Sequence, residues 1–525
     1  MRGSWLIAFV FMSPGKLFAR IRSYISRGGL FKCQACSVMT SSWVQFPLIY
    51  NFDVRVWLRQ LSKEIGQRIT LSEIPDSEIE KWSTAHFDAI WLMGVWQTGE
   101  KSRILALDNP HVTDERAALL PDWKSDDVVA SPYSIADYRV AEALGGEAAL
   151  AELRKRLAQR GIKLILDFVP NHTAPDHPWV GTNREFYISI PDERLEQMQE
   201  GAYFATEDGT HLACGRDPNL PPFRDTLQLN FANGDLRSAL IGTLQRIATQ
   251  CDGVRCDLAM LVLKDVFNRT WGSLAGEMRA EFWDVAIAEV RKVAPQFLFV
   301  AEAYWGTEWH LQRLGFDFTY DKTLYDRILQ GDISGVKAHL TADWEFASKL
   351  VRFTENHDEA PAAAAFGANN KAASLLTLTL TGLRLMHEGQ REGLHHKLPL
   401  FSLRRLEEEP DLDVEAFYDR LLEVIGNPSI TRGDFRLIES KGEGSETVIA
   451  FQRCCGEEGR IICAVNLSDR GSEISFETDA FAHVKDYREM RIISTERTRS
   501  PQVDLWPGGI TLRLRAHEGL LFVVR

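Results

Sequence analysis

The sequence has no cysteine pattern of the kind that builds a metal site or a disulfide scaffold. Eight cysteines are spread over 525 residues, and the one close pair, Cys33 and Cys36, has no second pair to complete a zinc site. No strand–helix–strand pattern surrounds this pair, which argues against a redox role. The scattered cysteines fit a reducing compartment, so we expect a cytoplasmic protein.

Long apolar runs are also missing. The run at residues 5–12 has eight apolar residues and is too short to cross a bilayer. It could be the core of a signal peptide, but no small-x-small cleavage site follows it, so export stays open as the alternative location. The first 52 residues carry six Lys or Arg and no acidic residue. We treat residues 1–45 as an atypical basic extension and leave them out of the fold prediction.

Positive charge is not in excess either. The formal net charge is −13, which argues against nucleic acid or an anionic membrane as a partner. The sequence contains no internal repeat and no low-complexity tract. Aromatic residues are plentiful, with 14 Trp and 28 Phe, and both sugar-binding clefts and hydrophobic cores use them. Nothing in the sequence indicates an oligomeric state.

The chain is long enough for one large domain and one or two smaller ones. From residue 47 onward, apolar strand-like runs alternate with amphipathic helical segments, as in βα units around a parallel sheet. The predicted strands are 47–57, 88–93, 163–172, 251–260, the run ending at Glu302, 315–321, 349–359 and 380–389. The predicted helices are 76–82, 145–161, 236–249, 277–293, 322–329, 370–376 and 414–425.

Three segments break this alternation. Residues 94–137 are predicted to be a long loop. Residues 173–228 are rich in Pro, Gly, Asp and Asn, and a structureless loop of that length is improbable, so we expect a small inserted domain there. After residue 428, short alternating runs such as TVIAFQR and IICAVNL indicate an antiparallel sandwich of about one hundred residues.

Polar side chains end several of the predicted buried strands. Glu302 ends the fifth strand, where a carboxylate either caps the strand or lies in a pocket. In GVRCD, Arg255 and Asp257 share one face of the fourth strand. Burying both is costly unless they are hydrogen-bonded. They form either a structural ion pair or a nucleophilic carboxylate that a cation keeps ionised.

Two further strands end in the same way. The seventh strand ends with Asn356, His357 and Asp358, and the third carries Asp167 and His172. A solvated loop or a capped strand end would explain either cluster alone. The carboxyl ends of barrel strands surround one cleft, however, so we expect the four clusters to converge. Such a set of carboxylates, Arg and His matches the needs of glycoside hydrolysis.

These motifs resemble those of the α-amylase superfamily, glycoside hydrolase family 13. The matching segments are DFVPNH (167–172), GVRCD (253–257), the strand ending at Glu302 and NHD (356–358), with DTLQLN (225–230) similar to a further short motif. The resemblance covers about residues 47–525 and implies a (β/α)8 TIM barrel, a small domain inserted after strand three and a C-terminal antiparallel β-sandwich. The implied domains are 46–172 with 229–427 for the barrel, 173–228 for the insertion and 428–525 for the sandwich.

The resemblance also implies roles for single residues. Asp257 would be the nucleophile, Glu302 the general acid/base and Asp358 the stabiliser of the transition state. The implied substrate-binding residues are Arg255, His172, His357 and Tyr133. The resemblance makes Asn171 a possible calcium position, so a structural calcium ion is possible although the chemistry needs no cofactor.

The sequence departs from many starch-cleaving members of the superfamily after the fourth strand. Those members have Lys-His where this chain has Met260 and Leu261, which suggests a different or shorter acceptor side. We expect a retaining α-glycoside hydrolase that cleaves α-glucosidic bonds of malto-oligosaccharides or small α-glucosides through a covalent glycosyl-enzyme. A transglycosylase or isomerase resembling trehalose synthase is the alternative within the superfamily, and a catalytically inactive sugar-binding protein is the alternative outside it. The expected partner is an oligosaccharide, with neither nucleic acid nor membrane.

Overall fold

The computed structural model describes residues 43–481, 490–496 and 500–524. The basic extension predicted at residues 1–45 and the pair Cys33 and Cys36 therefore lie almost entirely outside the described residues. No helix within the described residues has the length and apolar character needed to cross a membrane.

Eight parallel strands form a closed barrel, which confirms the predicted fold class. Going around the barrel, the strands are β1 (Leu48–Asp53), β14 (Leu383–His387), β13 (Leu350–Arg352), β12 (Phe318–Tyr320), β11 (Leu298–Ala301), β10 (Gly253–Cys256), β5 (Lys163–Phe168) and β2 (Ala89–Met93). Nearly all their residues are buried, as expected for parallel strands covered on both faces. The strongly apolar runs of the sequence therefore locate the strands well.

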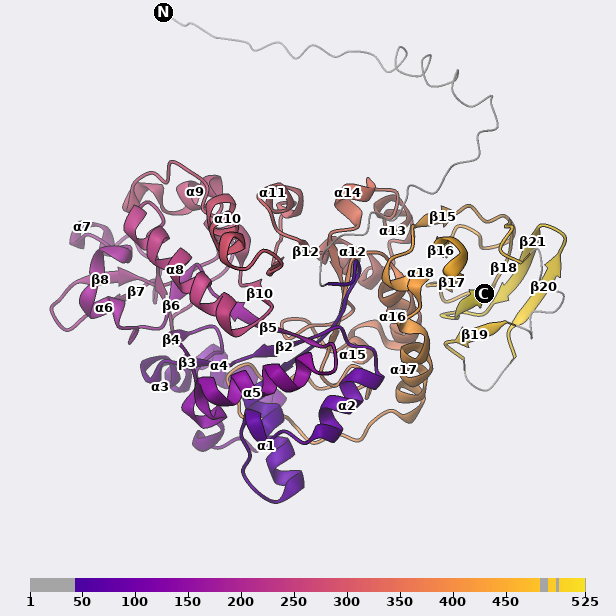
Figure 1. Ribbon diagram of the computed structural model, residues 1–525. Helices are drawn as coiled ribbons and strands as arrows, with labels where there is room; N and C mark the ends of the chain where they lie inside the picture. Colours follow the sequence, from indigo (N-terminus) through magenta and orange to yellow (C-terminus); the bar gives the residue numbers. More distant parts are fainter. Residues whose placement is uncertain (1–42, 482–489, 497–499, 525) are drawn as a thin grey trace, which may run out of the picture. The chain divides into compact units, whose positions relative to one another are not determined.

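Helices follow the barrel strands in the chain and surround them (Figure 1). They are α1 (Val54–Ile65), α2 (Asp76–Thr84), α5 (Gly146–Ala158), α8 (Gly234–Gln250), α9 (Lys264–Ala275), α10 (Trp283–Val293), α11 (Glu308–Arg313), α12 (Lys322–Leu329), α13 (Ile333–His339), α14 (Trp344–Ala347), α15 (Ala362–Phe366), α16 (Asn370–Thr379), α17 (Leu412–Ile425) and α18 (Pro428–Thr431). Among these, α1, α9, α11, α13–α15 and α18 are not predicted from the sequence.

The predicted first strand, residues 47–57, is too long. The strand ends at Asp53, whose carboxylate accepts a hydrogen bond from the backbone N–H of Arg55 and caps α1. Leu58 and Leu61 then continue the buried face of a helix. The alternation Val54-Arg-Val56 looks like a strand, but it is the first turn of this helix.

The predicted loop at 94–137 is also wrong, because it contains regular structure. It holds β3 (Trp96–Thr98), α3 (Glu100–Asp108), α4 (Pro110–Leu119) and the start of β4 (Ile135–Val140), which pairs with β3. Most residues of α3 are not buried, and an amphipathic pattern is correspondingly weak there. The helices therefore give little periodic signal in the sequence.

Three predicted strands extend beyond the observed ends of β5, β10 and β13. The predictions reach residues 172, 260 and 359, whereas the strands end at Phe168, Cys256 and Arg352. The residues in excess leave the barrel and form the loops at its carboxyl end. The other polar residues of the clusters therefore belong to these loops, whereas Asp167 and Arg255 lie in β5 and β10 themselves.

The segment predicted as an inserted domain contains short elements only. These are β6 (His172–Thr173) paired with β9 (Leu227–Gln228), β7 (Tyr203–Ala205) paired with β8 (His211–Ala213), and the helices α6 (Trp179–Thr182) and α7 (Asp192–Leu195). The β6–β9 pairing joins the two ends of the segment directly after the third barrel strand.

The C-terminal part is antiparallel, as predicted. One sheet contains β15 (Arg436–Ile438), β16 (Val448–Cys454), β17 (Arg460–Asn466), β22 (Gly519–Val524) and β19 (Arg491–Ser494), and the other contains β18 (Ser472–Glu477), β21 (Gly509–Leu514) and β20 (Gln502–Trp506). Buried residues of both sheets, such as Ile462 and Leu512, share one core. The guanidinium of Arg453 in β16 donates to the backbone carbonyls of Thr379, Leu380 and Ile430, which fixes this part to the barrel.

Candidate active site

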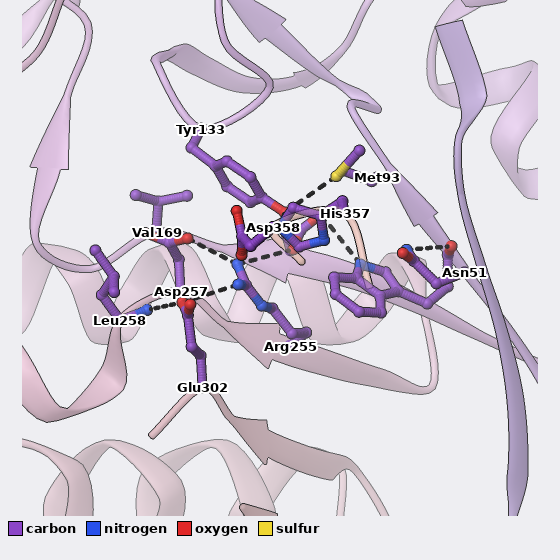
Figure 2. A network of polar contacts seen from close by, with 12 residues as sticks. Asn51, Met93, Tyr133, Val169, Arg255, Asp257, Leu258, Glu302, His357 and Asp358 are labelled. Atoms are coloured by element: carbon purple, nitrogen blue, oxygen red, sulfur yellow. Dashed lines mark hydrogen bonds and ion pairs between the residues drawn. The ribbon is translucent and has the colours of Figure 1, made fainter. Parts of the chain in front are cut away.

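The predicted carboxylates lie at the carboxyl end of the barrel, where the strands position them. Asp257 directly follows β10, Glu302 directly follows β11, and Asp358 lies in the loop after β13. Figure 2 shows the three side chains around Arg255, which projects from β10 itself. Parallel pairing of β10 with β11 brings Asp257 and Glu302 to the same level, because Cys256 pairs with Ala301.

Arg255 lies at the centre of this cluster. Its Nη1 donates to Asp257 Oδ1 at 2.7 Å, and its Nη2 lies 2.8 Å from Glu302 Oε2. Asp167 is farther away, with 3.7 Å between Oδ1 and Nη1. All four side chains are buried. A guanidinium is planar and carries several donors, so one arginine can hold two carboxylates at a fixed separation.

Two further contacts fix Glu302. Its Oε2 accepts from the backbone N–H of Leu258 at 2.6 Å, and its Oε1 accepts from the hydroxyl of Tyr304 at 2.8 Å. Leu258 has a φ of 41°, in the left-handed region that residues other than glycine seldom adopt. The residue after Asp257 therefore takes up an unfavourable backbone conformation in which its N–H reaches Glu302.

Burial shifts the pKa of Asp257. The pKa of Asp257 is raised to about 8, mainly because the carboxyl is desolvated; the charge on Glu302 adds to this rise, while Arg255 opposes it. The raised pKa favours the protonated form of the Asp257 carboxyl in the empty site.

Asp358 and Tyr133 both contact the same nitrogen of His357. The Tyr133 hydroxyl lies 2.7 Å from His357 Nε2, which in turn lies 3.1 Å from Asp358 Oδ2. The side chain of Asp358 is 42% exposed, so it can meet a ligand. Partial desolvation raises the pKa of Asp358, but the attraction of His357, and then of Arg255 and Lys397, outweighs this and lowers the pKa overall.

Aromatic rings enclose the guanidinium of Arg255. Its central carbon lies 5.0 Å from the ring centroid of Tyr133, 5.4 Å from that of Trp91 and 5.8 Å from that of Tyr320. Such contacts stabilise a desolvated cation. The sequence prediction includes Tyr133 but misses Trp91, Tyr304 and Tyr320, because aromatic residues in or beside buried strands are typical of an ordinary core.

His172 is close to this cluster without touching its carboxylates. Its ring packs edge-on against Phe223 at 5.6 Å between centroids. Burial lowers its pKa to about 4, with the backbone of Tyr133 acting weakly in the opposite direction, so the imidazole is neutral. Asp167 accepts from Trp91 Nε1 at 3.2 Å, and burial raises its pKa to about 6.

Asn171, the possible calcium position, does not fit a cation here. Its backbone and side-chain oxygens both accept from Gln228 Nε2, each at 3.0 Å. Calcium ions bind six to eight oxygens, several of them from carboxylates. No group of three or more His, Cys, Asp or Glu within the described residues could hold a metal ion.

Met260 and Leu261 lie in a short turn after β10, and both side chains are buried. Neither offers an exposed group to a ligand. Met260 and Leu261 therefore pack in the hydrophobic core and cannot make the polar contacts that Lys-His would make at these positions.

A pocket adjoins the cluster on the side of β1, β2, β13 and β14. His357 belongs to both the pocket and the cluster. Other lining residues are Asp53, Met93, Glu355, His387, Glu388 and Arg405. The barrel mouth therefore combines a charged cluster on one half with a polar pocket on the other.

A family model described as "Alpha amylase, catalytic domain" matches residues 84–411. The chain belongs to the alpha-amylase family. Alpha-amylase MalA of Haloarcula japonica is 24% identical over 435 residues, which are 80% of this chain and 55% of that protein. Oligo-1,6-glucosidase of Parageobacillus thermoglucosidasius is 39% identical over 169 residues, 28% of each chain.

Solved structures share the alpha-amylase fold over most of the chain. The alpha-amylase from H. orenii superposes with a TM-score of 0.64 at 18% identity, covering 92% of this chain and all of that one. Eubacterium rectale Amy13B gives a TM-score of 0.65 at 14% identity, with 92% and 96% covered. At such identities the likeness establishes the fold alone. The chain spans about half the length of the first curated relatives that it matches.

Proposed function

We propose that the protein is a retaining α-glycoside hydrolase of α-glucosidic bonds in malto-oligosaccharides or small α-glucosides. The observation that carries this proposal is the contact of Arg255 with both Asp257 and Glu302. One guanidinium bridging two carboxyl groups supports the short separation, about 5 Å, that retaining glycosidases need between nucleophile and acid. Inverting enzymes need a wider gap that admits a water molecule.

In the first step, Asp257 attacks the anomeric carbon while Glu302 gives its proton to the glycosidic oxygen. The bond between that carbon and oxygen breaks, the leaving sugar departs as an alcohol, and the glycone becomes an ester of Asp257. The mechanism requires that Glu302 carry a proton and that Asp257 be ionised when substrate binds. Arg255 keeps Asp257 ionised in that state, because the cation stabilises the carboxylate.

In the second step, Glu302 takes a proton from water, and the water oxygen attacks the anomeric carbon. The ester bond breaks, Asp257 leaves as a carboxylate, and the sugar is released with its original α-configuration. The proton balance closes, because Glu302 ends each cycle as it began.

Asp358 and its partners would bind the sugar at the reacting centre. A carboxylate favours the positive charge that develops on the ring in the transition state. His357 would hold Asp358 through its Nε2, the atom that Tyr133 also contacts, and neutral His172 would bind a sugar hydroxyl. The choice of α-glucosidic substrates rests on the relatives, which are named alpha-amylase, alpha-glucosidase and oligo-1,6-glucosidase.

The test combines the product's configuration with one variant. Purified protein is mixed with maltotriose, and proton NMR follows the first product formed, which should be the α-anomer. Asp257→Asn should lower kcat by roughly 10⁴-fold or more while the protein still binds oligosaccharide. Asp265→Asn, at an exposed position on α9, is the matched control and should keep parental activity.

Several results would contradict the proposal. A β-anomer as first product would exclude a retaining mechanism, and full activity of the Asp257 variant would exclude that nucleophile. Formation of trehalose or longer oligosaccharides in place of glucose and maltose would identify the protein as a transferase or isomerase, in which a sugar hydroxyl replaces water in the second step.

A further inference from the structure

Gln228 connects the far end of the inserted segment to the loop after the third barrel strand. It lies in β9, pairs with His172 of β6 and is fully buried. Its amide nitrogen Nε2 faces three oxygens: Asn171 O at 3.0 Å, Asn171 Oδ1 at 3.0 Å and Leu229 O at 3.1 Å. An amide nitrogen has two hydrogens, so three acceptors around it satisfy its donors completely.

This arrangement fixes the orientation of both amides. If the Gln228 amide were turned over, its oxygen would face three other oxygens. Because Oδ1 of Asn171 accepts from Gln228, the nitrogen of the Asn171 amide points the other way and lies 3.3 Å from His172 Nδ1. A nitrogen that carries hydrogens can only donate there, so Nδ1 of His172 must be unprotonated. The proton of the neutral ring then sits on Nε2.

Three oxygens converging on one point are the kind of group that also binds a cation. Here they are all neutral, and no cluster of three acidic, His or Cys residues within the described residues could complete a cation site. A divalent ion bound to three neutral oxygens would not recover the large cost of leaving water. A neutral donor meets the same oxygens without that cost.

We propose that the side-chain amide of Gln228 takes the place of a cation at this junction and positions Asn171, and through it His172, without a metal. Gln228 is then a positioning residue, since it acts through its neighbours. The proposal that no metal is bound at this junction does not depend on any catalytic activity. The proposal that His172 is oriented in order to bind sugar rests on the proposed function.

Thermal unfolding of the full chain tests the metal-free junction. The melting temperature of the parent should be the same in excess EDTA and in excess calcium chloride. Gln228→Leu should lower it by several degrees in both, because the oxygens of Asn171 and Leu229 lose their donor. Gln228→Asp should melt lower in EDTA than in calcium, because a carboxylate would let the ring of oxygens accept the ion.

A second buried glutamine serves as a control. It separates the proposed positioning of His172 from the general effect of losing a buried amide. Gln312 is also buried, and its Nε2 faces Thr319 Oγ1, Phe346 O and Lys349 O at 3.0–3.4 Å, far along the chain from His172. Gln312→Leu should lower the melting temperature as well. Nitrogen-15 NMR of labelled histidines, with His172 assigned by its loss in His172→Gln, should show the Nε2-protonated ring in the parent and in Gln312→Leu. In Gln228→Leu the His172 signals should shift.

Each of the following results would contradict one part of the proposal. Calcium-dependent melting of the parent would show that a metal holds the junction. Parental melting of Gln228→Leu would show that the amide stabilises nothing. Absence of any calcium effect on Gln228→Asp would show that the oxygens do not form a cation-like ring. Unchanged His172 signals in Gln228→Leu would remove the positioning role. None of these measurements requires catalytic turnover.

Discussion

Arg255 and Glu302 come from neighbouring barrel strands, and 2.8 Å separates Nη2 of the first from Oε2 of the second. The same guanidinium donates to Asp257 at 2.7 Å. The pairing of β10 with β11 therefore sets the distance between the two carboxyl groups that the proposed mechanism uses. A change in either strand would alter the chemistry even if every polar residue were kept.

Arg255→Lys should abolish most of the activity. An ammonium group is a single point charge and cannot hold two carboxylates at once, so we expect kcat/KM to fall roughly 10³-fold. Arg513→Lys is the matched control, because Arg513 also pairs with two carboxylates, Glu473 and Asp504, but at the exposed surface. Kinetics with maltotriose measure the effect. Similar kinetics for the two variants would show that Arg255 is only a structural cation.

Tyr133→Phe tests the contact of Tyr133 with His357, the residue that also contacts Asp358. The variant loses the hydroxyl that lies 2.7 Å from His357 Nε2 but keeps the ring, so kcat/KM should fall about tenfold with little change in melting temperature. Tyr187→Phe removes a comparable buried hydroxyl, bonded to Thr173 at 2.9 Å, and should leave kcat/KM within about twofold. Unchanged kinetics of Tyr133→Phe would show that this hydroxyl has no part in catalysis.

Glu355 should make stability depend on pH. Burial raises its pKa to about 8 from an ordinary 4.5, so between these values the folded protein holds a proton that the unfolded chain releases. The contribution of Glu355 to the free energy of unfolding therefore decreases as pH rises between these two pKa values, by at most about 1.4 kcal/mol per pH unit. Glu355→Gln keeps an oxygen for the N–H of Ala362 and cannot ionise.

The measurement is the difference in melting temperature between Glu355→Gln and the parent from pH 5 to pH 8. We expect the melting temperature of Glu355→Gln, relative to that of the parent, to increase steadily as pH rises. Glu407→Gln, at an exposed position, should show no such trend. A constant difference for Glu355→Gln would mean that this carboxyl titrates normally.

Arg453→Met tests the connection between the barrel and the C-terminal sheets. Arg453 is buried, and its Nη1 donates to three backbone carbonyls at 2.7–3.1 Å. Leaving these carbonyls without a donor should cost about 3 kcal/mol or more of unfolding free energy. Denaturant unfolding measures it, with Arg436→Met at an exposed position of β15 as the control. Equal stability of the two variants would show that packing alone joins the two parts.

The sequence was sufficient to predict the barrel, because its strands are short, almost wholly apolar runs. It was insufficient where the local pattern and the tertiary context conflict. At Val54–Ile65 the first residues alternate as in a strand, but Asp53 caps a helix that begins there. Helices α3 and α4 were missed because most of α3 is not buried, so no periodic face marks that stretch.

The candidate site shows the same division. Charged residues at strand ends are costly to bury, so Arg255, Asp257 and Glu302 are visible in the sequence as exceptions. In the sequence, Trp91 and Tyr320 look like ordinary core residues. Only the structure shows that their rings lie near the guanidinium of Arg255. Gln228 could not be predicted, because its partners are backbone and amide oxygens that only the paired strands bring together. The roles assigned to these residues remain predictions for the experiments above.

The charges around Arg255 do not balance: Asp167, Asp257 and Glu302 share one guanidinium, and Asp358 adds a further acid at the rim. Carboxyl groups therefore outnumber the guanidinium that they share where a bound sugar ring would lie. Ring analogues that carry a protonated nitrogen should inhibit the protein more strongly than neutral sugars of the same shape. Their advantage should shrink as the medium becomes alkaline enough to remove that proton.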